Sequence, residues 1–131
     1  SSHKARKIYE QVYDKTNLDL ASKYEQLGHI YADKNDKGNS LLYYHKAEEI
    51  YKQISGKKSR DFAFISLCLG EEYHNLKDYD KALQYYHTAR KIKEQFGDKE
   101  SLELQYIYIV LWGVLILTQR NIIKHCVTMV R

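Results

Sequence analysis

The sequence predicts an all-α fold in which antiparallel helical hairpins stack into a solenoid. Three observations predict it: the 131-residue chain repeats itself every 42 residues, apolar residues recur with helical spacing throughout, and there is no proline. A fixed period of roughly 20–50 residues is typical of stacked structural units, and proline would break a helix from inside. These observations disfavour a closed fold around one catalytic pocket.

The repeat is visible as identical residues in register. At the 42-residue period, one set of aligned residues is His3, His45 and His87, then Ala5, Ala47 and Ala89, then Ile8, Ile50 and Ile92, then Gln11, Gln53 and Gln95. A second set is Leu27, Leu69 and Leu111, with Gly28 matching Gly70, Tyr31 matching Tyr73, and Tyr43-Tyr44 matching Tyr85-Tyr86. The chain therefore holds about three repeats, close to the minimum for a stable array.

Helical periodicity predicts six helices, over about 3–14, 18–35, 39–55, 59–76, 79–96 and 100–118, and a weaker seventh over about 120–130. The first, third and fifth share the aligned histidine, alanine, isoleucine and glutamine. The second, fourth and sixth share the aligned leucine. Short loops make neighbouring helices antiparallel, and alternating strand patterns are missing, so no sheet is expected.

Turn and cap residues fall between these helices. Asp36-Lys37-Gly38-Asn39 predicts a turn, with Asn39 as the cap of the next helix, and Asp78-Tyr79-Asp80 is its counterpart. Gly56 and Gly97 suit left-handed C-terminal caps. Acidic residues near three helix starts favour the helix dipole, namely Asp19, Asp61 and Glu103.

Composition narrows the function. The net charge is +4, from 21 basic and 17 acidic residues that are mixed along the helices, so no dense cationic block indicates nucleic-acid binding. The two cysteines, Cys68 and Cys126, lack metal-ligand neighbours and are expected to be reduced, buried thiols of a cytoplasmic protein. The apolar run over 106–117 has 12 residues, whereas a membrane-spanning helix needs about 20, so a core helix is expected and no membrane partner.

Two successive copies match a known signature, W-x2-L-G-x2-Y followed by A-x3-F. The first reads Tyr24-x2-Leu27-Gly28-x2-Tyr31, then Ser40-x3-Tyr44-x2-Ala47; the second reads Ser66-x2-Leu69-Gly70-x2-Tyr73, then Ala82-x3-Tyr86-x2-Ala89. Over about residues 1–118 the chain resembles tetratricopeptide repeat proteins, which implies a right-handed superhelix. These signature residues are read as structural: the glycines and alanines allow close helix approach, and the tyrosines fill gaps between hairpins.

The repeats are longer than the usual 34 residues and resemble those of kinesin light chains, cell-polarity adaptors and peptide-pheromone receptors. The prediction is one domain over 1–131, as a piece of a longer chain that begins within a repeat: 1–17 as the second helix of a preceding repeat, 18–58 and 59–99 as repeats, and 100–131 as a divergent repeat or cap. In this last segment Trp112 replaces the glycine and Leu115 the tyrosine. Its apolar end makes a homo-oligomer through 106–131 a possible outcome, with packing over the last hairpin as the alternative.

The resemblance implies that the first helix of each hairpin lines a concave groove. The predicted partner-binding residues are Glu25, His29, Asp33, Phe64, Leu67, Cys68, Glu71, His74, Tyr106 and Ile109, with Ser22, Gln26, Asn75, Val110 and Gly113 at other groove positions. None is Lys or Arg, which disfavours the clamp that chaperone-binding members use for a C-terminal carboxylate. The expected ligand is a segment with hydrophobic anchors and a basic flank, such as an amphipathic helix. The alternative is that a flanking segment of the protein fills the apolar stretch.

Catalysis and metal binding are not expected. His3, His45 and His87 lie one repeat apart, and His125-Cys126 are helix neighbours that point about 100° apart. Phosphate-loop and Ser-His-Asp patterns are also missing. The predicted function is a protein-interaction scaffold without a cofactor. The alternatives are a peptide-responsive regulator with a separate output domain, and an oligomerisation module.

Overall fold

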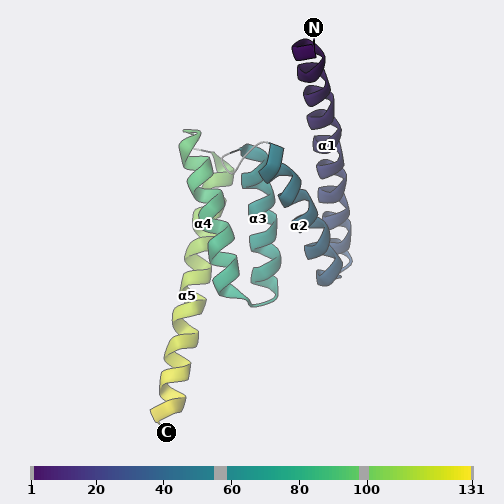
Figure 1. Ribbon diagram of the computed structural model, residues 1–131. Coiled ribbons are helices and arrows are strands. Elements are labelled where there is room, and N and C mark those ends of the chain that lie inside the picture. The colour runs from purple at the N-terminus through teal and green to yellow at the C-terminus, as the bar shows by residue number, and fades with distance from the viewer. Residues whose placement is uncertain (1, 55–58, 98–100, 131) are drawn as a thin grey trace. The chain divides into compact units, whose positions relative to one another are not determined.

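The computed structural model describes residues 2–54, 59–97 and 101–130, and over these residues it consists of helices joined by short turns, without strands. Its helices are α1 (Ser2–Asp33), α2 (Lys37–Ile54), α3 (Arg60–Asn75), α4 (Tyr79–Gln95) and α5 (Leu102–Val130) (Figure 1). The chain divides into two compact units, Ser1–Ile65 and Ser66–Arg131, and the division falls inside α3.

The first unit is built on the hairpin of α1 and α2. Gly28 on α1 is buried against the Tyr44 ring of α2, and a Cβ at Gly28 would lie 2.5 Å from two ring carbons. Tyr31 stacks on Tyr43 with ring centroids 5.5 Å apart and planes 4° from parallel. The fully buried Ala47 completes this close helix pair. The close approach of α1 and α2 at Gly28 is the one that the signature predicts.

The second unit repeats these contacts one period later. A Cβ at Gly70 on α3 would lie 2.7 Å from the Tyr86 ring of α4, and Tyr73 stacks on Tyr85 at 5.7 Å and 4°. Its core consists of Leu67, Ala82, Tyr86, Ala89, Ile107, Leu111 and Val114, from α3, α4 and α5. An ion pair between Lys93 and Glu103, at 2.5 Å, joins α4 to α5. The packing contacts therefore recur with the same 42-residue period as the residues themselves.

The tyrosines at the end of each signature lie elsewhere than expected. The sequence predicts Tyr31 and Tyr73 in gaps between hairpins, but each stacks on the second helix of its own hairpin. The reason is that the second helix of each hairpin carries two adjacent tyrosines. The first of them, Tyr43 or Tyr85, faces the signature tyrosine directly. Each stacked pair of rings holds together the two helices of its own hairpin.

The turns inside the two hairpins also repeat. Asn35 and Lys77 both adopt a left-handed backbone conformation, with φ of 61° and 64°. The following aspartates then cap the next helix, since Asp36 Oδ1 accepts from the Asn39 amide at 3.2 Å and Asp78 Oδ1 from the Lys81 amide at 3.4 Å. The prediction of Asn39 as the cap is wrong, because α2 begins at Lys37. Gly97 has the predicted left-handed conformation, with φ of 76°, and Gly56 lies outside the described residues.

Two predicted helix breaks are absent. The predicted helices over 3–14 and 18–35 form the single helix α1, and those over 100–118 and 120–130 form α5. Both junctions lack glycine and proline, and at the first junction Thr16 and Asn17 are mediocre helix formers that a longer helix tolerates. Beyond the packed regions, residues 2–16 of α1 and 121–130 of α5 are exposed to solvent.

Candidate functional site

The predicted groove residues fall into one set in each unit. Glu25, His29, Asp33 and Phe64 belong to the first unit, and Leu67, Cys68, Glu71, His74, Tyr106 and Ile109 to the second. All of them come from α1, α3 and α5, the helices that carry the signature glycine or its counterpart.

In the first unit, the structure brings His29 and Phe64 together. Their rings meet edge to face with centroids 6.1 Å apart, so α1 and the first turn of α3 share one surface. His29 Nδ1 also lies 2.7 Å from the Tyr44 hydroxyl. Phe64 keeps 37% of its surface exposed, and Asp33, at the end of α1, is exposed as well. This surface offers one apolar contact beside polar groups.

Glu25 lies on the same helix, one turn before His29. Burial raises the pKa of the Glu25 carboxyl from 4.5 to about 7, and the negative charge of Asp61 adds to the increase. Glu25 and Asp61 thus form a partly desolvated pair of acidic groups. A basic group of a bound partner would lower this pKa by stabilising the charged form.

We expect stability to depend on this carboxyl. Because its pKa is raised in the folded state, its favourable contribution is present below pH 4.5 and is lost as the pH rises through about 7. The free energy of unfolding should therefore fall across this window, and Glu25→Gln should flatten the fall. Urea denaturation at a series of pH values measures it, with the exposed Glu49→Gln as control. A Glu25 carboxyl that titrates at its ordinary value by carbon NMR would contradict the prediction.

In the second unit, two predicted groove residues are buried. Leu67 is 8% exposed and belongs to the core beside Tyr86 and Ile107, and Cys68 is buried too. Both are therefore core residues rather than exposed groove residues. Helical periodicity places Leu67 on the correct helix, but α4 and α5 both pack against it. Ile109, in contrast, is 70% exposed.

Three other groove residues meet at one pocket, which we call the Tyr86 pocket. It has a volume of about 380 Å³ and is lined by Glu71, His74, Asn75, Tyr86, Tyr106 and Val110. Tyr106 on α5 donates a hydrogen bond of 2.6 Å to Glu71 Oε1 on α3. Burial, together with this bond and the charge of Glu71, raises the pKa of Tyr106 to about 12. Glu71, His74 and Tyr106 thus form one polar surface in the second unit.

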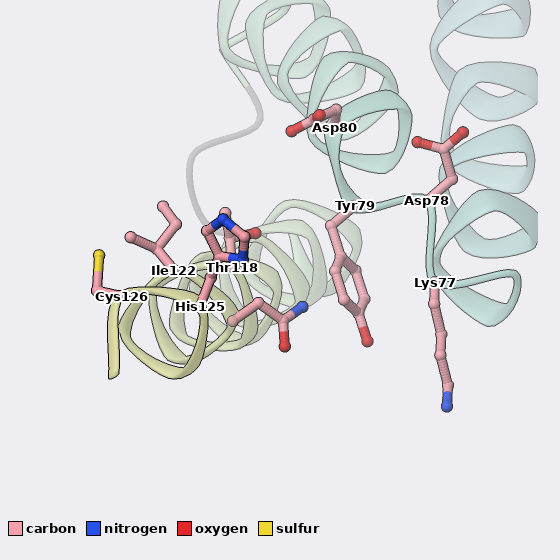
Figure 2. A pocket seen from close by; sticks show the side chains of 9 residues that line it. Lys77, Asp78, Tyr79, Asp80, Thr118, Ile122, His125 and Cys126 are labelled. Carbon is pink, nitrogen blue, oxygen red and sulfur yellow. The ribbon is translucent and has the colours of Figure 1, made fainter. Parts of the chain in front are cut away.

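The end of the chain presents a different surface. Another pocket, of about 520 Å³, lies between the start of α4 and the C-terminal part of α5, with Tyr79, Asp80, Thr118, Ile122, His125 and Cys126 among its lining residues (Figure 2). Cys126 is exposed, so its prediction as a buried thiol is wrong, because this part of α5 extends beyond α4. The described residues contain no group of three His, Cys, Asp or Glu that could hold a metal ion.

Helix α5 is also long and apolar enough, by length and composition alone, to cross a membrane. Over an 18-residue window its mean hydropathy is 1.5 and 17% of the window is buried. The 12-residue limit argued from the sequence therefore does not hold, because the helix continues through the predicted break. Core helices of soluble proteins can meet the same criterion. Here Leu104, Ile107, Leu111 and Val114 are buried, while Arg120 and Lys124 lie in the exposed part.

Sequence reasoning assigned one residue of the Tyr86 pocket a structural role only. Tyr86 packs on Gly70 within its own hairpin, and it is also one of the residues that line the pocket. The 42-residue register could have indicated this position. Tyr86 is the counterpart of Tyr44, whose hydroxyl contacts His29, and residue 71 is the counterpart of residue 29. No residue in register indicates the pocket at the C-terminal end, because that pocket exists only when α5 continues through the predicted break.

Comparison with known proteins places the fold. No protein-family profile and no curated protein matches the sequence. Among solved structures, the chain is similar to the crystal structure of BtubC (BKLC) from P. vanneervenii, with a TM-score of 0.67 and 23% identity. The match covers 72% of this chain but only 38% of BtubC, so the chain spans well under half the length of that protein. The chain has an all-helical repeat fold of the kind found in BtubC.

Proposed function

We propose that this chain is a protein-interaction scaffold of the tetratricopeptide type, which binds a peptide or helical segment of a partner protein in a cytoplasmic setting. The observation that carries the proposal is the meeting of Glu71, His74 and Tyr106, three predicted groove residues from two helices, at one open pocket. The repeated Gly–Tyr contacts support it, because they hold each hairpin in a fixed geometry before a ligand arrives. A pre-ordered surface lowers the entropy cost of binding.

The chemistry of the surface favours an amphipathic, basic segment. The first unit offers the acidic Glu25 and Asp33 beside the exposed Phe64, and the second unit offers Glu71 beside the exposed Tyr106 and Ile109. Such a ligand would place hydrophobic anchors on the rings and basic residues near the carboxylates. We propose that this non-catalytic binding is the activity of the chain and needs no cofactor.

A displayed library of helical peptides, selected on the purified chain, tests this function. Calorimetry then compares the natural chain with Glu71→Lys and with Glu49→Lys, which reverses an exposed charge on α2 outside the predicted groove. We expect Glu71→Lys to weaken binding by about tenfold or more, or about 1.4 kcal/mol, since it places like charges together. We expect Glu49→Lys to change the affinity by less than about twofold. Equal effects of the two substitutions would refute the groove assignment.

A second candidate function, self-association, has its own observation. Helix α5 exposes Tyr108, Ile109, Trp112, Ile116, Ile122, Ile123, Val127 and Met129, an apolar area of the kind that marks interaction surfaces. A second copy of the chain could cover it. Sedimentation over a concentration series, with Trp112→Glu as the comparison, tests this, and a monomer at every concentration would exclude it.

A further inference from the structure

The two repeats differ in the hydrogen bonding of one tyrosine hydroxyl group. In the first unit the Tyr44 hydroxyl lies 2.7 Å from His29 Nδ1. In the second unit the equivalent Tyr86 is fully buried, and its hydroxyl has no hydrogen-bond partner among the described residues. The residue in the position of His29 is Glu71, whose carboxylate accepts the Tyr106 hydroxyl instead. A buried polar group without a partner is unusual and calls for an explanation.

The residue that carries this unpaired hydroxyl lines an open pocket. Tyr86 lines the Tyr86 pocket beside Glu71, Tyr106 and His74, but its hydroxyl oxygen is buried, so a ligand that pairs with this oxygen has to displace the side chains that cover it. The surroundings are negative: burial raises the pKa of Tyr86 well above its usual value, and the charges of Glu71 and Glu72 raise it further. No lysine or arginine is among the lining residues. The pocket therefore suits a cation that donates hydrogen bonds.

We propose that the Tyr86 pocket binds the guanidinium group of an arginine side chain from the partner segment. This inference rests on the proposed function and specifies the ligand chemistry of that surface. An arginine side chain has five N–H donors and no acceptor. One edge can donate to the Glu71 carboxylate, which retains acceptor capacity beside its bond from Tyr106, and another N–H can donate to the Tyr86 oxygen.

The geometry favours arginine over lysine and over an anion. Glu71 and Tyr86 lie on different helices, so a planar fork that reaches two separated acceptors fits better than a compact ammonium group. The exposed Tyr106 ring offers a face on which a guanidinium can stack. A carboxylate or phosphate would meet the Glu71 carboxylate, and no lysine or arginine is among the lining residues to pair with it.

The probe is N-acetyl-arginine methylamide, titrated into the nitrogen-15-labelled chain and followed by amide chemical shifts. We expect saturable shifts in residues 71–75 and 106–110 with a dissociation constant of about 1–10 mM, as suits one small group. The citrulline analogue, which has the same shape without the charge, should bind at least about fivefold more weakly, and so should the lysine analogue. Equal shifts with arginine and citrulline, equal affinity for lysine, or no saturable shift would each overturn the proposal.

Variants separate this pocket from general attraction of a cation. Tyr86→Phe removes only the unpaired hydroxyl and should weaken arginine binding severalfold while the fold is kept, and Glu71→Gln should abolish it. The matched control is Tyr44→Phe, the same deletion one repeat earlier, which should leave the arginine affinity unchanged. Unchanged affinity in Tyr86→Phe would overturn the assignment. Failure here would leave the proposed function standing if selected peptides still bind and are sensitive to Glu71→Lys, so the two proposals can fail independently.

Discussion

Replacing Gly28 by alanine should destabilise the first unit by about 1–2 kcal/mol. The new Cβ would lie 2.5 Å from two carbons of the Tyr44 ring, far inside van der Waals contact. The ring is buried and its hydroxyl contacts His29, so it cannot swing aside without losing that contact. Overpacking of this kind costs about 1–3 kcal/mol, and it outweighs the gain of about 1 kcal/mol that alanine brings to an ordinary helix position.

Gly113→Ala is the matched control, and its effect should have the opposite sign. Gly113 lies within α5, and a Cβ there would meet nothing within 4 Å. The substitution should therefore show only the helix-propensity gain, a stabilisation of about 0.5–1 kcal/mol. Urea denaturation followed by circular dichroism measures both variants. Equal stability of the two variants would show that the Gly28–Tyr44 contact is not as close as described.

Replacing Leu67 by aspartate should cost the second unit about 4 kcal/mol or more. The side chain is buried beside Tyr86, Ala89 and Ile107, so the substitution removes apolar packing and places a carboxylate in the core. Loss of a buried leucine alone costs about 2–5 kcal/mol, and an unpaired buried charge adds to it. The expected result is loss of the cooperative unfolding transition of residues 66–131 at room temperature.

Ile109→Asp separates this effect from the mere presence of a new charge. Ile109 was predicted in the same groove but is largely exposed, so its substitution should change the free energy of unfolding by less than about 0.5 kcal/mol. Leu67→Ala should lie between the two variants. A Leu67→Asp protein as stable as Ile109→Asp would show that Leu67 faces solvent, as the sequence alone suggested.

The hairpin contacts could be predicted from the sequence because they depend on residues that recur in register. Gly28 with Tyr44 and Gly70 with Tyr86 are each determined within one hairpin, so spacing and residue size suffice to identify them. The left-handed turn at Asn35 and Lys77 recurs for the same reason, although neither residue is glycine. Local geometry that repeats is recognisable without knowledge of the whole fold.

The remaining features depend on contacts between helices or on the continuity of a helix. Residues that recur in the repeat do not indicate either of these. Whether Leu67 is an exposed anchor or a core residue depends on α4 and α5 packing on the same side of α3. The unbroken course of α1 and α5 depends on the absence of strong breakers at their midpoints, which periodicity does not reveal. The Tyr86 pocket needs side chains from α3, α4 and α5, so spacing in one helix could indicate Glu71 and His74 but not their meeting with Tyr86 and Tyr106.

The repeated Gly–Tyr contact also bears on how the chain folds. Each hairpin carries its own close approach, its own stacked ring pair and its own capped turn, all between residues near in sequence. Contacts of such low contact order form quickly, and stability in repeat arrays adds up from one unit to the next. We therefore expect the hairpins to open one at a time, as separate cooperative elements, rather than in a single all-or-none event.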